Sequence, residues 1–396
     1  MTDRPATATA GRSAAATAQI FVADPEATAT IRQTIDSIGL RNAEFISGNI
    51  ETATAALAQR ASPRLLIVDI SGLENPVAKV NELAEVCEPN TGVIVIGDRN
   101  DIVLYRDLKH AGVVEYFFKP LVGNLVTRAC NVVLGGETDA PATRTGKLVF
   151  VLGVRGGVGA TTIAVNTAWY LAETRQRWVM LVDLDLQTGD AALQLDVSPT
   201  HALREAFEHP ERIDKLFLER AAIQVEHRID LLASLEPLAE TVTIEESAVL
   251  TLLERLLNRY RFIFVDLPPP VAMRMMQVLE LPSTCVLVSN GTLASARDVA
   301  RWRQLIGANT AERTTLHLLN QQGAPGSLSD ADFARAAGRT ADIVIPYERD
   351  IGVANTLGIK GAQQNAALKR GLAPLLRHLS GEQVEAPRSV LRRLFG

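Results

Sequence analysis

A glycine-rich segment, GVRGGVGATT at residues 153–162, has the composition of a phosphate-binding loop. It follows an apolar run, residues 147–153, and precedes a helical pattern. Its backbone N–H groups and the helix N-terminus would therefore both face a bound anion. A standard loop of this kind ends in Gly-Lys-Ser/Thr. Here Ala160 occupies the lysine position, while Thr161 retains the hydroxyl that binds magnesium. The alternative is a glycine-rich strand–helix turn that binds nothing.

Three aspartates end apolar strand patterns elsewhere in the chain. Asp183 and Asp185 stand two residues apart in LVDLD, and Asp266 ends FIFVD. A strand-end aspartate can hold magnesium through water, although each one alone also suits a cap on the next helix. Asp183 and Asp185 point the same way if the strand continues, and part ways if the chain turns between them. Together with the glycine-rich loop, these residues predict a site for ATP and Mg2+.

These residues need a sheet whose strand ends meet at one edge. Apolar runs alternate with helical patterns, which is typical of parallel sheets flanked by helices. In the first third of the chain we expect helices over residues 26–38 and 121–134, and strands at 19–23, 64–69, 92–97 and 113–118. Further on we expect strands at 147–153, 178–183, 229–233, 261–266, 284–289 and 314–319. We therefore predict an α/β protein whose doubly wound part binds ligands at the carboxyl ends of its strands.

Composition predicts the domain boundaries. Residues 1–18 are rich in Ala and Thr and are read as a disordered tail. Residues 19–134 form a first α/β domain, and 135–146 (GGETDAPATRTG) form a linker without periodicity. A second α/β domain follows at 147–380, and a tail ends the chain at 381–396.

The overall composition weighs against several functional classes. The formal net charge is -5, which disfavours a nucleic-acid binder. Cys87, Cys130 and Cys285 lie far apart and form no CxxC pair, so we expect neither a zinc site nor a disulfide framework. A reducing cytoplasm fits this usage. No apolar run reaches the roughly 18 residues that suggest a membrane span.

Three segments resemble the motifs of one ATPase family. RGGVGATT, DLDLQ and FVDLPP resemble the deviant Walker A, switch I and Walker B motifs of the MinD/ParA ATPases, over about residues 147–380. In the family pattern KGGxGKT, the first lysine reaches across a dimer interface to the partner's nucleotide. Arg155 stands at that position, and arginine can bind two phosphate oxygens at once. It would replace that contact and partly compensate for Ala160. The resemblance therefore implies a homodimer.

The same resemblance assigns roles within the site. It implies that Asp185 positions the attacking water, that Asp183 belongs to the magnesium shell or switch, and that Thr161 and Asp266 serve Mg2+. Asn320 falls where the family reads adenine, with a strand-end cap as the alternative, and Pro346 falls in a loop that walls the base. The implied nucleotide-binding set comprises Arg155, Gly156, Gly157, Val158, Gly159, Ala160, Thr161, Thr162, Asn320 and Pro346.

A second set of residues resembles the site of response-regulator receivers. Asp24 follows the first strand, Asp69 ends a later one at the phosphoacceptor position, and Lys119 begins a Lys-Pro pair. Receiver chemistry needs an acidic magnesium site, an acceptor carboxylate and a cation. Two features depart from the pattern: Glu26 is a displaced second acid, and Gly97 stands where Thr or Ser is expected. We favour a pseudo-receiver used for dimerisation or docking over a phosphorylated switch.

An atypical receiver joined to a MinD-like domain with an altered Walker A motif resembles the CpaE/TadZ pilus-assembly localisation proteins. Residues 97–121 (GDRNDIVLYRDLKHAGVVEYFFKPL) resemble the CpaE group in particular. This resemblance implies an ATP-binding protein that places a type IVb (Flp/Tad) pilus secretion machine at a cell pole, with weak hydrolysis driving a dimer/monomer switch. The alternatives are a nonhydrolysing nucleotide-bound scaffold and a ParA-like DNA-partitioning ATPase, which the acidic balance disfavours.

The end of the chain, RSVLRRLFG at residues 388–396, has a basic amphipathic pattern. At about 100° per residue its apolar and basic side chains separate. Such a segment suits an anionic membrane surface and resembles the membrane-targeting tail of MinD. The alternative is a frayed tail that packs back on the domain. We expect a cytoplasmic protein that contacts the inner membrane, a cell pole or a partner through Val390, Leu391, Arg392, Arg393, Leu394 and Phe395.

Overall fold

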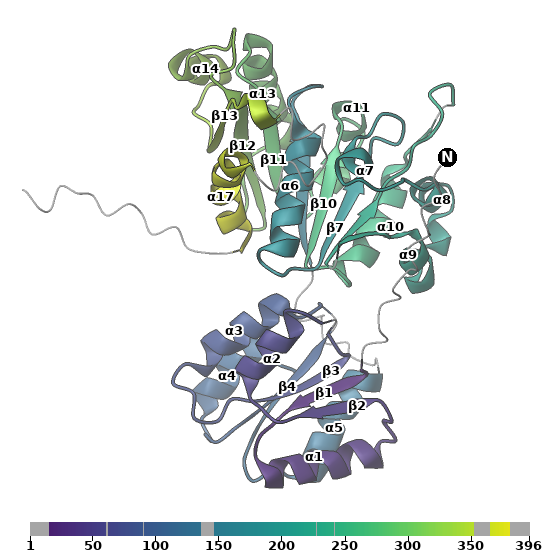
Figure 1. Cartoon of the computed structure of the whole chain (residues 1–396), viewed down its shortest axis with the longest axis vertical. Helices are drawn as coiled ribbons and strands as arrows, with labels where there is room; N and C mark the ends of the chain where they lie inside the picture. The colour runs from purple at the N-terminus through teal and green to yellow at the C-terminus, as the bar shows by residue number, and fades with distance from the viewer. Residues whose placement is uncertain are drawn as a thin grey trace, which may run out of the picture. The chain divides into compact units, whose positions relative to one another are not determined.

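The computed structural model divides the chain into two compact units, Met1–Thr145 and Gly146–Gly396, each built on one sheet (Figure 1). It describes residues 16–60, 62–89, 91–135, 146–226, 228–240, 242–351 and 365–380. The predicted tail at 381–396, with its membrane-contacting residues, lies outside this range, as do residues 1–15 of the predicted N-terminal tail and most of the predicted linker.

Unit 1 is a five-stranded parallel sheet with the strand order β2-β1-β3-β4-β5. This is the flavodoxin-like order, in which the winding direction reverses between β1 and β3. Ligands of such sheets bind at the carboxyl ends of the strands near that reversal. The strands are β1 (Ala18–Phe21), β2 (Ala43–Ile46), β3 (Leu65–Asp69), β4 (Gly92–Gly97) and β5 (Glu115–Phe118).

The alternation of side chains along β3 and β4 divides unit 1 into two apolar cores, because successive residues of a strand face opposite sides. Leu66, Val68, Val93 and Val95 pack with α2 (Ile50–Leu57), α3 (Pro76–Val86) and α4 (Ile102–His110). Leu65, Ile67, Ile94 and Ile96 pack with α1 (Pro25–Ser37) and α5 (Gly123–Gly135). Both faces of the sheet are therefore covered, as its continuous apolar strands require.

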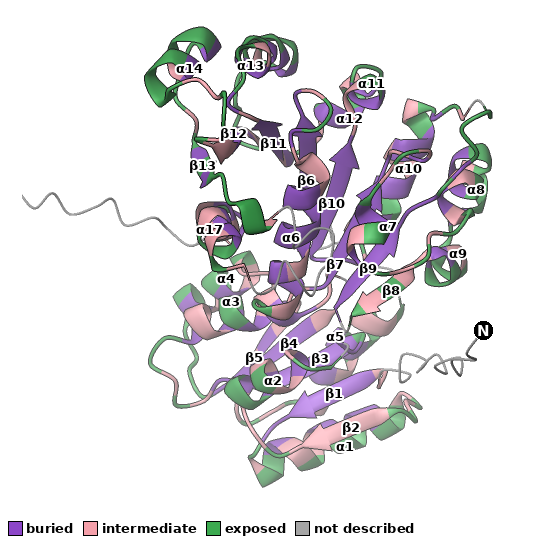
Figure 2. Cartoon of the chain, turned by 45° about the horizontal axis from the view of Figure 1, so that its top comes forward, coloured by how far each residue is buried: buried purple, intermediate pink, exposed green. Residues whose placement is uncertain are grey.

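Unit 2 is an eight-stranded sheet with the order β13-β12-β11-β6-β10-β7-β9-β8. Its strands run parallel, except that β8 at one edge is antiparallel to β9. The central strands are buried along almost their whole length, and Figure 2 shows this burial along β10 and β7. The strands are β6 (Lys147–Gly153), β7 (Val179–Asp183), β8 (Ile223–Glu226), β9 (Ile229–Leu232), β10 (Phe262–Leu267), β11 (Ser283–Ser289), β12 (Arg313–Gln322) and β13 (Ile343–Pro346).

Among the helices of unit 2, α6 (Ala160–Glu173) is the most deeply placed, since ten of its residues are buried. It contacts β6, β7, β9 and β10 and therefore lies against the middle of the sheet. The other helices that the structure describes in this unit are α7 (Ala191–Gln194), α8 (Ala202–Glu208), η1 (Pro210–Arg212), α9 (Lys215–Ala221), α10 (Glu246–Leu257), α11 (Pro269–Ala272), α12 (Met276–Leu279), α13 (Leu293–Ile306), α14 (Asp330–Ala337) and α17 (Ala366–Ser380).

The predicted α/β class and the doubly wound second sheet are confirmed. The sequence patterns missed the strands β2, β8 and β13, all of which lie at sheet edges. Within the described part of the chain, every helix is too short or too polar to cross a bilayer.

Candidate functional site

The glycine-rich loop connects the end of β6 to the start of α6, as the sequence predicted. Gly157 and Gly159 have φ angles of 77° and 87°, in the left-handed region where a side chain would be strained. Gly159 is the N-cap residue of α6 and has no side chain to accept from the first-turn N–H groups. Those groups have no partner within the helix, so the loop and the helix N-terminus together suit an anion.

Two neighbouring elements brace the loop at its carbonyl groups. The indole Nε1 of Trp302 on α13 donates to the carbonyl of Val154 at 3.2 Å. The amide Nδ2 of Asn320 on β12 donates to the carbonyl of Val158 at 2.9 Å. A Cβ atom at Gly159 would lie 2.5 Å from the same Asn320 nitrogen, so this position requires glycine for space as well as for conformation. Asn320, which we predicted to read adenine, thus lies directly against the loop.

The loop cation Arg155 pairs with a carboxylate on α13. Its Nε lies 3.6 Å from Oδ2 of Asp298, and its side chain is 40% exposed. The same carboxylate pairs with Arg297 at 2.9 Å and lies 3.7 Å from Arg301. Three guanidinium groups therefore surround one carboxylate beside the loop, which leaves an excess of positive charge there.

Asp183 and Asp266 lie side by side at the carboxyl ends of adjacent strands, β7 and β10, which pair in register at these two residues. Both are buried, with exposed fractions of 2% and 5%. Asp183 accepts hydrogen bonds from the backbone N–H groups of Asp185 at 3.0 Å and Ala191 at 3.2 Å. The hydroxyl of Thr161, in the first turn of α6, lies near enough to Asp266 to lower its pKa. The predicted loop and strand-end residues therefore meet at one edge of the sheet.

Burial raises the pKa of both carboxyls, because the low-dielectric interior disfavours their charged forms. It raises the pKa of Asp183 to about 6 and that of Asp266 to about 8, and the nearby acidic groups add to both increases. The hydroxyl of Thr161 acts in the opposite direction on the pKa of Asp266. A cation at this edge would relieve the cost of two adjacent buried carboxylates.

The donor set fits magnesium, which prefers carboxylate, hydroxyl and water oxygens. Among the residues that the structure describes, no three His, Cys, Asp or Glu side chains converge in a way that could hold a metal. Magnesium is commonly held by one or two carboxylates, with phosphate and water oxygens filling its remaining positions. Thr161 and Asp266 would therefore share the ion with a bound nucleotide.

The side chains of Asp183 and Asp185 point in different directions, because β7 ends at Asp183 and the chain turns there. The Asp185 carboxylate accepts from the backbone N–H of Thr188 at 2.8 Å and from its hydroxyl at 2.7 Å. A Cβ atom at Gly189 would lie 2.4 Å from Oδ2 of Asp183, so only glycine fits where the turn closes. The predicted water-positioning residue is thus held by its own loop in this structure.

Pro346 ends β13, and its side chain is exposed. Two strands, β12 and β11, separate β13 from β6 in the sheet. The role of Pro346 in the loop that lines the nucleotide base stays a prediction.

The receiver-like residues of unit 1 also come together at the carboxyl ends of their strands. The Nζ of Lys119 lies 2.6 Å from Oδ2 of Asp69 and 3.3 Å from Oδ2 of Asp24. Asp24 also caps α1 by accepting from the N–H groups of Glu26 at 2.9 Å and Ala27 at 3.0 Å. The hydrogen bond from Ala27, together with Lys119, lowers the pKa of Asp24 against the opposing effect of burial.

Position 97, where receivers carry a hydroxyl residue, is filled by a neighbouring ring. A Cβ atom at Gly97 would lie 2.5 Å from the hydroxyl oxygen of Tyr116. That hydroxyl donates to the carbonyl of Arg99 at 2.7 Å, and the ring is buried. There is therefore no room for a threonine or serine side chain at this position unless the tyrosine moves.

Sequence reasoning missed the residues that hold the predicted ones in place. Asp298 and Trp302 lie within an ordinary helical pattern, and Tyr116 lies within an apolar strand pattern. Their spacing matches no motif. The one usable signal was that an acid and an indole, Asp298 and Trp302, stand four residues apart and so share the buried side of α13.

Comparison with known proteins finds relatives of the fold of unit 2. A family model for an AAA domain (AAA_31) matches residues 146–306. The structure of a ParA family ATPase from Chlorobium tepidum TLS superposes with a TM-score of 0.52 and 21% identity, over 59% of this chain and 99% of that one. Unit 2 thus has the fold of a MinD/ParA-like P-loop ATPase domain, and this part of the predicted resemblance is confirmed.

Two further proteins share parts of the sequence. The chain is 22% identical over 188 residues to a septum site-determining protein MinD of Tupiella akineta. That match spans 47% of this chain and only 60% of the length of that relative. The chain is also 33% identical to a pilus assembly protein CpaE from Caulobacter crescentus CB15, over 29% of this chain and 97% of that one, with a TM-score of 0.28.

Proposed function

We propose that the protein binds ATP with Mg2+ at the glycine-rich loop, and that nucleotide occupancy controls its dimerisation. The observation that carries this proposal is the convergence of the loop, the uncapped N-terminus of α6 and the buried pair Asp183–Asp266 at one sheet edge. Phosphate charge would be met by helix N–H groups and by Arg155, and the ion by Thr161 and Asp266. Bound Mg2+ would screen the phosphates and polarise the terminal one.

Hydrolysis at this site is proposed to be slow. Ala160 removes the lysine that normally binds the β- and γ-phosphates, and the remaining loop cation, Arg155, is shared with Asp298. Asp185 must leave its bonds to Thr188 before it can orient a water molecule. These three features favour a long-lived ATP-bound state, and a homodimer that closes on the nucleotide would persist until hydrolysis.

A second candidate is a scaffold that binds nucleotide without turnover. The local engagement of Asp185 favours it, since a carboxylate satisfied by its own turn has less need of a substrate water. The two candidates differ for Asp185→Ala. The substitution traps an ATP-bound dimer if hydrolysis normally releases it, and it changes nothing in a scaffold.

For unit 1 we propose a docking or dimerisation role rather than phosphoryl transfer. Lys119, at 2.6 Å from Oδ2 of Asp69, is compatible with either role, but the other carboxylate oxygen, Oδ1, accepts from the Ser71 hydroxyl at 2.6 Å. The hydroxyl residue expected at position 97 is glycine, and Tyr116 fills its space. Incubation with acetyl phosphate should therefore leave no acid-stable, base-labile label on Asp69.

The cellular role that we propose is the placement of a type IVb (Flp/Tad) pilus secretion machine, for which residues 97–121 and the order of the two units provide the support. A fluorescent fusion in a piliated host should form polar foci that Arg155→Ala disperses. If the polar foci persist in the Arg155→Ala variant, polar placement does not depend on nucleotide binding. The amphipathic end of the chain is proposed to contact anionic membrane, and deletion of residues 388–396 should abolish liposome binding.

The test of the proposed function is Mg-ATP titration of the purified protein, followed by hydrolysis and light-scattering mass measurements. We expect the protein to bind ATP, to hydrolyse it slowly and to increase in mass when ATP is added. The Arg155→Ala variant should bind ATP more weakly and show a smaller increase in mass. Binding without turnover would select the scaffold. No binding at all would overturn the proposal.

A further inference from the structure

The loop that carries Asp185 is tied to a second loop about fifty residues further along the chain. The backbone N–H of Glu236 donates to the carbonyl of Leu186 at 2.7 Å. Because donor and acceptor both belong to the backbone, this bond holds the path of the two loops and not only their side chains.

A side chain adds a second connection between the same two loops. The amide Nε2 of Gln187 donates to the carbonyls of Pro237 at 3.0 Å and Glu240 at 2.9 Å. The segment after β7 and the segment after β9 are therefore joined by hydrogen bonds whose donors lie on both sides.

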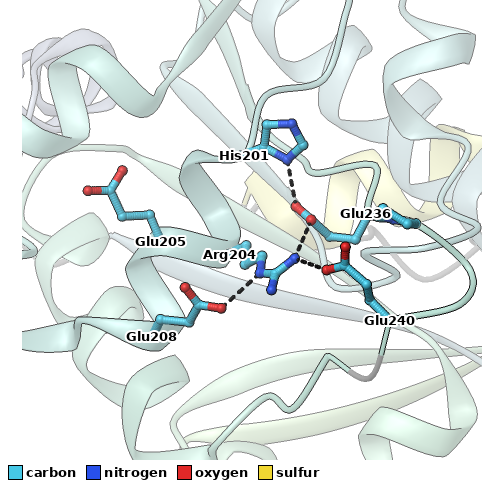
Figure 3. A pocket seen from close by; sticks show the side chains of 7 residues that line it. His201, Arg204, Glu205, Glu208, Glu236 and Glu240 are labelled. Carbon is cyan, nitrogen blue, oxygen red and sulfur yellow. Dashed lines mark hydrogen bonds and ion pairs between the residues drawn. The ribbon is translucent and has the colours of Figure 1, made fainter.

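The second loop is held in turn by α8, as Figure 3 shows. The Glu236 carboxylate, whose side chain is 1% exposed, lies 3.0 Å from Nδ1 of His201 and 2.9 Å from Nη1 of Arg204. Arg204 also pairs with Glu208 at 2.8 Å and Glu240 at 2.5 Å. These side chains line an open pocket of about 380 Å³ beside α8.

A buried carboxylate is costly to separate from its cation, because the charge left behind has no solvent to stabilise it. Glu236 and Arg204 should therefore move together, and the segment 234–240 should move with α8. The backbone N–H of Arg204 adds a bond to the Ser234 hydroxyl at 3.3 Å. By contrast, the bonds of Gln187 are neutral and lie near the surface, so they are the weakest connection in the series.

We propose that Gln187 is a latch that reports nucleotide occupancy from the Asp185 loop to α8. The inference rests on the proposed nucleotide binding. Asp185 must release Thr188 to face a phosphate or its water, and this turn of the backbone withdraws the Gln187 amide from the two carbonyls. The segment 234–240 then loses its hydrogen bonds to the Gln187 side chain, and the backbone of this segment and of α8 becomes more mobile.

Hydrogen exchange of the full-length protein tests this latch, measured with and without magnesium and a nonhydrolysable ATP analogue. Analogue affinity is measured on the same samples by calorimetry. In the unmodified protein, we expect the analogue to speed amide exchange in α8 and residues 234–240 by about threefold or more. In Gln187→Ala, these segments should exchange fast without nucleotide, and the analogue should add nothing while still binding.

The matched control is Glu205→Gln, which alters a pocket-lining glutamate outside the series of bonds to Gln187. It should keep the full response to the analogue. Two results overturn the latch: unchanged exchange in α8 when the analogue demonstrably binds, or a normal response in Gln187→Ala. A failure of the analogue to bind overturns the proposed function, and this inference with it.

Discussion

Arg155 in the phosphate loop and Asp298 on α13 form an ion pair with an Nε–Oδ2 distance of 3.6 Å. The carboxylate is also shared with Arg297 and Arg301. Three positive groups and one negative group therefore stand beside a loop that lacks the usual lysine. This cluster supplies cationic charge beside the loop, one group from the loop itself and two from α13.

The first prediction concerns this ion pair. Arg155→Ala should weaken Mg-ATP binding by about tenfold or more, because a charged hydrogen bond to phosphate is lost. Asp298→Asn should tighten binding by a few-fold, since it removes the competing anion and leaves the three arginines. Isothermal titration calorimetry at low salt measures both. Equal losses in the two variants would mean that the pair serves the fold instead of the nucleotide.

The second prediction concerns the missing lysine. Ala160→Lys should raise both ATP affinity and the hydrolysis rate, because it places an ammonium group at the start of α6, where the terminal phosphates are expected. The matched control is Ala160→Met, which adds similar length without charge. A steady-state phosphate-release assay distinguishes them. If the lysine variant hydrolyses no faster than the methionine variant, the loop does not hold the phosphates in the standard position.

The third prediction concerns the receiver-like unit. Gly97→Ala should destabilise unit 1 by about 1–3 kcal/mol, because the new Cβ meets the Tyr116 hydroxyl in a packed interior. Urea unfolding followed by circular dichroism gives the change. In the background of Tyr116→Ala, which opens the space, the same substitution should cost much less. Additive effects of the two substitutions would contradict the proposed clash.

The fourth prediction concerns acid stability. Burial lowers the pKa of His317 to about 4, against a partly opposing effect of Asp342. The unfolded chain therefore binds more protons than the folded chain between about pH 6.5 and pH 4, so stability falls as pH falls through this window. At pH 5 the loss from this group is about 2 kcal/mol.

His317→Gln should flatten this acid dependence, since glutamine does not titrate and can still hydrogen-bond to the Ser289 hydroxyl, which lies 2.8 Å from His317 Nε2. Free energies of unfolding at pH 5 and pH 7 measure the effect. Parallel pH profiles for the two proteins would show that other groups control acid stability.

Much of the candidate site followed from local sequence. Residues 148–152 are continuously apolar, as suits a strand buried on both faces, and the end of β6 is marked by glycines that only a tight loop requires. Asp183 and Asp266 were recognised because each ends such a run. Edge strands were missed for the converse reason: the residues of β2 are all half-buried, and those of β8 alternate between half-buried and exposed, so neither gives a strong apolar signal.

Local sequence is enough to identify the residues at strand ends and in the glycine-rich loop, because hydrophobic runs and backbone-permissive residues are local properties. Which of these residues come into contact depends on the three-dimensional fold. Strand order brings Asp266 beside Asp183, and Lys119 to Asp69 fifty residues away. The same long-range packing sets Asp298 against Arg155 and ties Gln187 to Glu240. Such pairings depend on sheet order and helix placement, which no spacing along the chain encodes.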